Sequence, residues 1–171
     1  MKKLGLLLMM LLILTGCAGK AQTTMEYVED GFGESTAQPY TIVFGAPDGL
    51  TQETFGEASR SNVYYAENGD YSITTEVLDA STVEEAVQSI SGFPMDQLEV
   101  ITLNRFPMDE YRFAWATCGE EESTVSRCAL IAGEDYYYVL TMTEKTGLGG
   151  TYDSVADYVF STFGLSMEEE V

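Results

Sequence analysis

Apolar and polar positions between residues 40 and 145 fall mostly into short runs that are rich in β-branched and aromatic residues. Clusters of glycine, proline, asparagine and aspartate separate these runs, which is typical of strands joined by turns. We expect strands at 40–44, 62–66, 71–78, 98–104, 111–117, 124–132 and 136–142. Asn68-Gly69 between two such runs predicts a hairpin with a type I′ turn. Thr51–Ser59 is ambiguous and is compatible with one or two helical turns.

Two stretches show helical periodicity instead. In residues 79–92, Ser81 and Glu84 match a capping box and Gly92 provides a stop signal. In residues 151–163 the apolar positions also fall on one helical face, and Gly164 ends the run. The apolar faces of the two helices consist of Val83, Ala86, Val87 and Ile90, and of Tyr152, Val155, Ala156, Val159, Phe160 and Phe163.

The run Tyr136–Met142 is apolar on both faces of a strand, so its sheet needs cover on both sides. We therefore predict an α+β fold: a single domain over residues 40–165, with an antiparallel sheet and helices packed on it. The element order, Tyr138–Thr141 before a glycine-rich loop, and Val159–Phe163 closing the last helix resemble the PsbP-like sandwich. That resemblance implies binding or assembly roles rather than catalysis.

The N-terminus resembles a bacterial lipoprotein signal. Lys2 and Lys3 precede an apolar run over 4–14, which is too short to span a bilayer and has the length of a secretory h-region. Leu14-Thr15-Gly16-Cys17 matches the lipobox, so we expect cleavage after residue 16 and lipidation of Cys17. The alternative is a buried apolar helix with a chance cysteine.

The predicted organisation is thus a signal peptide at 1–16, a lipidated Cys17 with a flexible tether at 17–39, the domain, and an acidic tail at 166–171. An alternative for the tether is that Met25–Val28 docks as a strand or short helix. The lipid anchor would hold the protein on the outer face of a membrane.

The chain carries 28 acidic and 8 basic residues and no histidine, for a formal net charge of −20. Such a surface repels phosphates, which excludes nucleic acid as an expected partner. It also repels anionic headgroups, so the domain is expected to stand off the membrane. The absence of histidine removes the usual general base and the usual transition-metal ligand.

Cys118 and Cys128 flank the turn of the predicted hairpin at 111–132. If they face each other, Ala116 pairs with Leu130 and Trp115 with Ile131, and both faces stay apolar away from the turn. We therefore predict a structural disulfide. The alternatives are a redox switch, a metal site or a reduced pair.

No catalytic signature stands out, and we expect no enzyme, cofactor or metal site. A Ser–Lys dyad with Lys145 lacks any supporting motif, and a pair among so many carboxylates is not diagnostic of a glycosidase. The acidic clusters at 120–122, 134–135 and 168–170 offer oxygen ligands for Ca²⁺, but a solvated acidic surface explains them as well.

Aromatic residues are the remaining candidates for binding. Alternation sends neighbouring residues to opposite faces, so we expect some of them, with Trp115, Tyr65 and Tyr137 as candidates, to meet a partner or a sugar. The alternative is a two-sided core. Arg105, Arg112 and Arg127 are expected to pair with carboxylates, and a site for an anionic ligand is the weaker alternative.

These features together predict a membrane-anchored extracytoplasmic lipoprotein that binds or assembles with an envelope protein partner. The second hypothesis is a surface lipoprotein that binds a small ligand or Ca²⁺.

Overall fold

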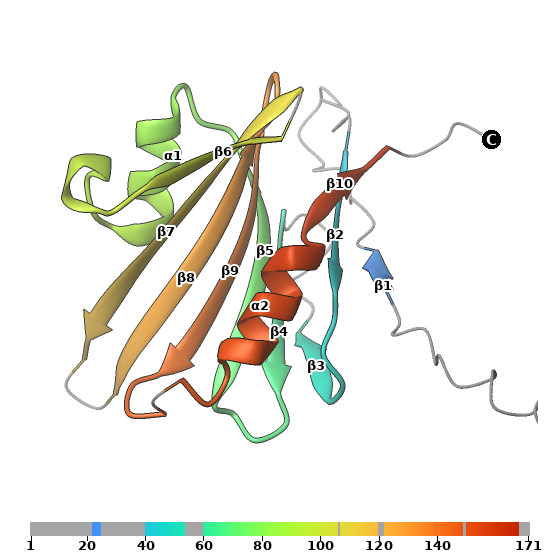
Figure 1. The fold of residues 1–171 in the computed structure, drawn as a ribbon, viewed down its shortest axis with the longest axis vertical. Helices are drawn as coiled ribbons and strands as arrows, with labels where there is room; N and C mark the ends of the chain where they lie inside the picture. Colours follow the sequence, from blue (N-terminus) through green and yellow to red (C-terminus); the bar gives the residue numbers. More distant parts are fainter. Residues whose placement is uncertain are drawn as a thin grey trace, which may run out of the picture.

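The computed structural model describes residues 22–24, 40–53, 60–105, 107–119, 122–148 and 150–167. The strands are β1 (Gln22–Thr24), β2 (Thr41–Gly45), β3 (Leu50–Glu53), β4 (Ser61–Ala66), β5 (Tyr71–Leu78), β6 (Ile101–Arg105), β7 (Met108–Cys118), β8 (Ser123–Ala132), β9 (Tyr137–Lys145) and β10 (Gly164–Ser166). The helices are α1 (Val83–Ser91), α2 (Asp153–Thr162) and a short 3₁₀ turn, η1 (Met95–Gln97) (Figure 1).

Seven strands form one antiparallel sheet in the order β3-β4-β5-β9-β8-β7-β6. A second, antiparallel sheet has the order β1-β2-β10. Strands β6 to β9 pair in chain order, as the predicted meander requires. The predicted α+β class, with an antiparallel sheet and two helices, is confirmed.

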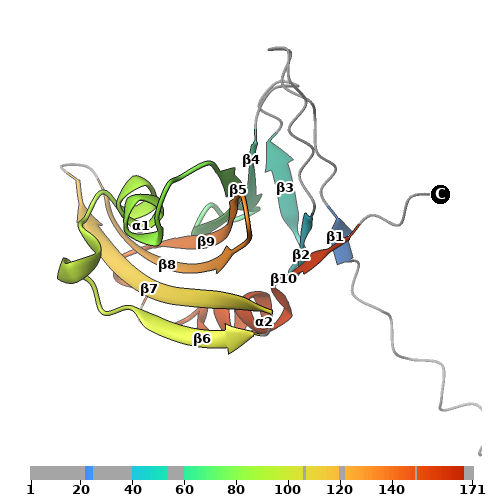
Figure 2. The ribbon, with the colours of Figure 1, turned by 90° about the horizontal axis from the view of Figure 1, so that it is seen from above.

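The large sheet is apolar on both faces and each face has its own helix. On β8, Cys128 and Leu130 point to the α1 side, whereas Ala129 and Ile131 join the core on the α2 side. Figure 2 shows α1 and α2 on opposite sides of the sheet. The apolar run at 136–142 predicted that both faces of the sheet need cover. The two helices meet this need.

Strand β2 and helix α2 close the larger core together. Phe44 on β2 and Val159 on α2 are fully buried in it. A Cβ atom on Gly45 would lie 2.6 Å from the ring of Tyr158, so a side chain there would displace Tyr158 from this close contact of β2 with α2. The backbone N–H of Gly45 donates to Thr162 Oγ1 at 2.8 Å and fastens this contact.

The hairpin between β4 and β5 forms where Asn68-Gly69 predicts it, but its turn is not type I′. Gly69 has φ +69°, while no described residue other than glycine has a positive φ. A type I′ turn needs positive φ at both central positions. Gly69 instead donates its N–H to Ala66 O at 2.9 Å and sits at the last position of a β-turn.

Helix α1 begins one residue later than the predicted capping box requires. Thr82 is the N-cap, and its side chain accepts from the N–H of Glu85 at 3.2 Å. Glu85 in turn accepts from the N–H of Ser81 at 2.9 Å. The cap therefore uses Thr82 and Glu85 rather than Ser81 and Glu84. The predicted stop is confirmed, because Gly92 is the C-cap with φ +78°.

Three short strands were not predicted. Leu50–Glu53 forms β3, so the helical alternative for the start of Thr51–Ser59 is wrong, and residues 54–59 lie outside the described part. Gly164 begins β10 after α2, and that strand includes Ser166 of the predicted tail. Strand β1 falls within the predicted tether and pairs with β2. These short strands owe their pairing to β2 or β4 rather than to a strong local pattern.

Candidate binding groove

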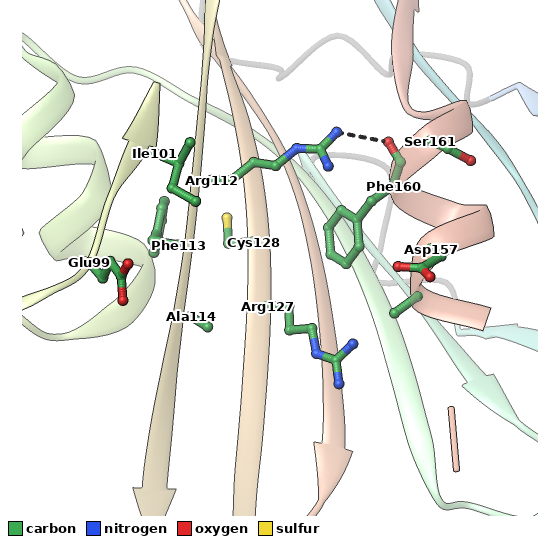
Figure 3. A pocket seen from close by; sticks show the side chains of 11 residues that line it. Glu99, Ile101, Arg112, Phe113, Ala114, Arg127, Cys128, Asp157, Phe160 and Ser161 are labelled. Carbon is green, nitrogen blue, oxygen red and sulfur yellow. Dashed lines mark hydrogen bonds between the residues drawn. The ribbon is translucent and has the colours of Figure 1, made fainter. Parts of the chain in front are cut away.

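A groove of about 680 Å³ runs between α2 and the outer strands of the large sheet (Figure 3). Alternate positions of β6, β7 and β8 face α2 there, because side chains of a strand alternate between the two faces. The groove is lined by Glu99, Ile101, Arg112, Phe113, Ala114, Arg127, Cys128, Ala156, Asp157, Phe160 and Ser161. Of these, Phe113 and Cys128 belong with their side chains to the core on the α1 side. Helix α2 covers the centre of the sheet and leaves the side of β6 and β7 open (Figure 1).

Glu110 on β7 is fully buried and stands between two arginines. Its Oε1 lies 2.5 Å from Arg112 Nε, and its Oε2 lies 2.5 Å from Arg105 Nε, although Oε2 makes no well-aligned hydrogen bond. The arginines also reach the end of α2: Arg112 donates to Phe160 O at 3.2 Å and Arg105 to Phe163 O at 2.8 Å. Cations at a helix C-terminus satisfy its free carbonyls and favour its dipole.

Arg127 links the first turn of α2 to the sheet through carboxylates. Its Nη2 lies 2.9 Å from Glu144 Oε1 on β9 and 2.5 Å from Asp153 Oδ1 in the first turn of α2. The prediction that Arg105, Arg112 and Arg127 pair with carboxylates is confirmed. Each of these arginines already pairs with a carboxylate, so the groove offers mainly apolar surface rather than a free cation for an anion.

Strand β6 forms one side of the groove and ends the large sheet. Ile101 is 55% exposed and Leu103 is 37% exposed, although both are large and apolar. The two lie on the same face of β6 as the groove, since they are two residues apart and Ile101 lines it. Sheet edges are commonly protected by charge, proline or a bulge, yet only Arg105 among the five β6 residues is charged.

The hairpin geometry leaves Thr102 directed at this open edge. Arg105 pairs with Met108 next to a two-residue loop, and such flanking residues exchange backbone hydrogen bonds. Hydrogen-bonded and non-hydrogen-bonded pairs alternate along an antiparallel ladder. Thr102 lies opposite Tyr111 in a non-hydrogen-bonded pair, so its N–H and C=O point away from β7. The edge therefore presents backbone donors and acceptors beside exposed apolar side chains.

The aromatic candidates lie on the opposite face of the sheet, with α1. The ring of Trp115 stacks on Phe113 at 5.7 Å and 27°. Tyr137 packs against the core under α1, and burial, followed by nearby Tyr111 and two glutamates, raises its pKa. Tyr65 is exposed, and burial and then Glu53 raise its pKa. None of the three lines the groove.

The predicted disulfide is not formed. Cys118 and Cys128 are both free, and the ladder pairs Phe113 with Cys128 and Cys118 with Ser123. Five positions therefore separate Cys118 from the residue opposite Cys128, which is about 17 Å along the strand. The buried thiol of Cys128 has its pKa raised to about 12, chiefly by burial. It is thus a core side chain rather than a reactive thiol.

Cys17 and the apolar run before it lie outside the described residues. None of the described helices has the length and apolar character needed to cross a bilayer. Within the described residues, no three side chains of His, Cys, Asp or Glu gather as a metal site would need. Glu120, Glu121 and the cluster at 168–170 lie outside that part of the chain.

Sequence reasoning missed the groove because its two sides are far apart in the chain. Ile101 and Phe160 meet only when α2 crosses the sheet. The signal available beforehand was the spacing of Ile101 and Leu103, which places two apolar residues on one face of a short strand.

Comparison with known proteins supports the fold alone. No family model matches the chain, and no curated protein sequence is similar to it. Its structure is similar to CyanoP, the PsbP of the cyanobacterium Synechocystis, with a TM-score of 0.54 and 12% identity over 88% of this chain and 96% of that one. It is also similar to LpqN of Mycobacterium tuberculosis, a protein involved in cell envelope biogenesis, with a TM-score of 0.50 and 10% identity over 85% and 91%.

A protein from Bacteroides thetaiotaomicron matches with a TM-score of 0.50 and 12% identity over 75% of this chain and 46% of that one. The chain therefore spans about half the length of that relative. Together these structures show that the chain has a PsbP-like α+β fold.

Proposed function

We propose that this chain is an extracytoplasmic, lipid-anchored protein that binds an extended segment of an envelope protein partner and has no enzymatic role. The observation that carries the proposal is the open edge of β6, where Ile101 and Leu103 are exposed beside a groove of about 680 Å³. A partner strand added to β6 would gain backbone hydrogen bonds, and its alternate side chains would enter the groove.

The proposed location is supported by the resemblance of Leu14–Cys17 to a lipobox. An anchored domain on the outer face of a membrane meets other envelope proteins at high local concentration. The involvement of LpqN in cell envelope biogenesis is consistent with such a setting.

Charge limits what the partner segment looks like. The chain has a net charge of −20, and the two arginines that line the groove, Arg112 and Arg127, already pair with carboxylates. Glu99 and Asp157 also line it and are exposed. A segment with apolar side chains toward α2 and a net positive charge fits this surface best, because complementary charge favours encounter.

Crosslinking in intact cells with the affinity-tagged full-length protein tests this function. A single dominant envelope protein is the expected product. Thr102→Pro removes the outward N–H of β6, which an edge strand tolerates, and should reduce that product to background. Thr102→Val keeps the N–H and is the matched control, with an unchanged yield expected. An equal yield from both variants, or no crosslinked partner at all, would contradict the proposal.

A further inference from the structure

A second set of binding groups lies on the other face of the large sheet, away from the groove and the β6 edge. The strand registers align five residues in one row across β4, β5, β9, β8 and β7: Tyr65, Ser72, Thr143, Ser126 and Trp115. Four interstrand spacings place the two aromatic ends about 19 Å apart. This row is called the hydroxyl row below.

Hydroxyl groups dominate the sheet face around this row. Ser126 Oγ and Thr143 Oγ1 are 2.9 Å apart and hydrogen-bonded. Neighbouring positions of the same face are Thr74 and Thr141 on one side of the row and Thr124 and Thr117 on the other. Toward α1 the same face turns apolar, with Val139 and Leu130 in the core. The hydroxyl-rich part therefore lies away from the core under α1. Ser126 and Thr141 are buried within it, whereas Ser72, Thr124 and Thr143 are partly exposed.

A hollow of about 160 Å³ opens at the Tyr65 end of the hydroxyl row. Its lining includes Tyr65, Ser72, Thr124 and Thr143. Four charged side chains also line it, and each has a partner in the protein. Glu122 and Lys145 form an ion pair of 3.2 Å, and Glu144 pairs with Arg127. The Asp70 carboxylate accepts from the Tyr152 hydroxyl and the Asn68 amide. The hollow thus combines an exposed ring with neutral groups that both donate and accept hydrogen bonds.

The aromatic ends are placed to act as platforms. Tyr65 is 43% exposed, and its hydroxyl bonds the Glu53 carboxylate. Trp115 is only partly buried, and its stacking on Phe113 fixes the plane of the ring. Rings held in this way pack against apolar C–H faces of a ligand while nearby hydroxyls bond its polar edge.

We propose that the hydroxyl row and its hollow bind a neutral saccharide chain. A sugar presents hydroxyls that match Ser72, Thr124 and Thr143, and C–H faces that match Tyr65 and Trp115. The excess of carboxylates at the hollow and the net charge of −20 disfavour acidic glycans. This site lies on the opposite face of the sheet from the groove, so it does not rest on the proposed protein partner.

Trp115 is the single tryptophan of the chain, so its fluorescence reports directly on the hydroxyl row. The full chain is titrated with soluble oligosaccharides of the cellulose, chitin, starch and mannan series. We expect a saturable change in emission with at least one series at millimolar concentration or below. Absence of a change with all four series would overturn the proposal.

Variants locate the binding. Tyr65→Ala removes the exposed ring and should weaken affinity about tenfold. Thr124→Val keeps the side-chain shape, removes one hydroxyl and should weaken affinity about fivefold. Phe93→Ala is the matched control, because Phe93 is 38% exposed and lies outside the row, and it should leave affinity unchanged. Equal affinities for Tyr65→Ala and Phe93→Ala would show that the saccharide binds elsewhere. Thr102→Pro should bind saccharide normally whether or not it binds a partner.

Discussion

Phe113, not Cys118, lies opposite Cys128 in the ladder between β7 and β8. Both side chains belong to the core that α1 covers. This pair decides the state of the two cysteines, because it removes Cys118 from bridging distance and encloses Cys128.

We therefore expect that only Cys118, of these two cysteines, reacts rapidly with a thiol reagent in the native protein. In a Cys17→Ser variant, Cys118 should react with iodoacetamide within minutes at about pH 8, since it is exposed. Cys128 should react only after unfolding, because burial raises its pKa to about 12 and blocks access. Peptide mapping by mass spectrometry measures both. A Cys118–Cys128 peptide under non-reducing conditions would contradict the register.

The N-cap of α1 gives a second test. Thr82→Ala removes the side-chain acceptor for the N–H of Glu85 and should lower the free energy of unfolding by about 1 kcal/mol. Ser81→Ala should change it by less than about 0.5 kcal/mol, because Ser81 contributes only its backbone N–H. Urea denaturation distinguishes the two. If Ser81→Ala lowered the free energy of unfolding more than Thr82→Ala, Ser81 would be the N-cap, as the sequence predicts.

The buried carboxylate of Glu110 gives a third test. Glu110→Gln keeps the shape but removes the charge between Arg105 and Arg112, which hold the end of α2. We expect the free energy of unfolding to fall by about 2 kcal/mol, below the range for fully buried pairs because both arginines are about one third exposed. Glu134→Gln, at an exposed turn, is the control. Equal stability of the two variants would mean that this cluster does not hold α2.

The raised pKa of Glu76 predicts that the stability of the protein depends on pH. Burial raises its pKa above the ordinary value of 4.5, so the folded state keeps its proton to a higher pH than the unfolded state does. Below about pH 4 Glu76 is protonated in both states, so it does not lower the free energy of unfolding. As the pH rises above 4.5 the unfolded chain ionises first, and the folded state loses relative stability until the folded pKa is passed.

Glu76→Gln should therefore be more stabilising at about pH 7 than at about pH 4. Thermal unfolding at the two pH values measures the difference, with Glu134→Gln again as the exposed control. A gain that is the same at both values would show that Glu76 ionises as freely in the fold as in the unfolded chain.

Much of the architecture was readable beforehand because it depends on neighbours in the chain. Runs of β-branched and aromatic residues marked β4 to β9, and apolar positions at helical spacing marked α1 and α2. The glycines at 69 and 92 marked a turn and a helix stop, since both have positive φ. The two-sided apolar run at 136–142 was enough to require cover on both faces of the sheet.

The sequence by itself thus determined the strand-rich α+β class, the meander and its two helices. The tertiary structure decided the register of β7 and β8, which differs from the predicted register by five positions. As a result, Trp115 lies opposite Ser126 rather than opposite Ile131. The hairpin is apolar on both faces away from the turn, so its pattern does not select a register, and only packing on α1 selects one. The groove and the hydroxyl row depend on the same long-range choice, because their residues meet only after α2 crosses the sheet and five strands align.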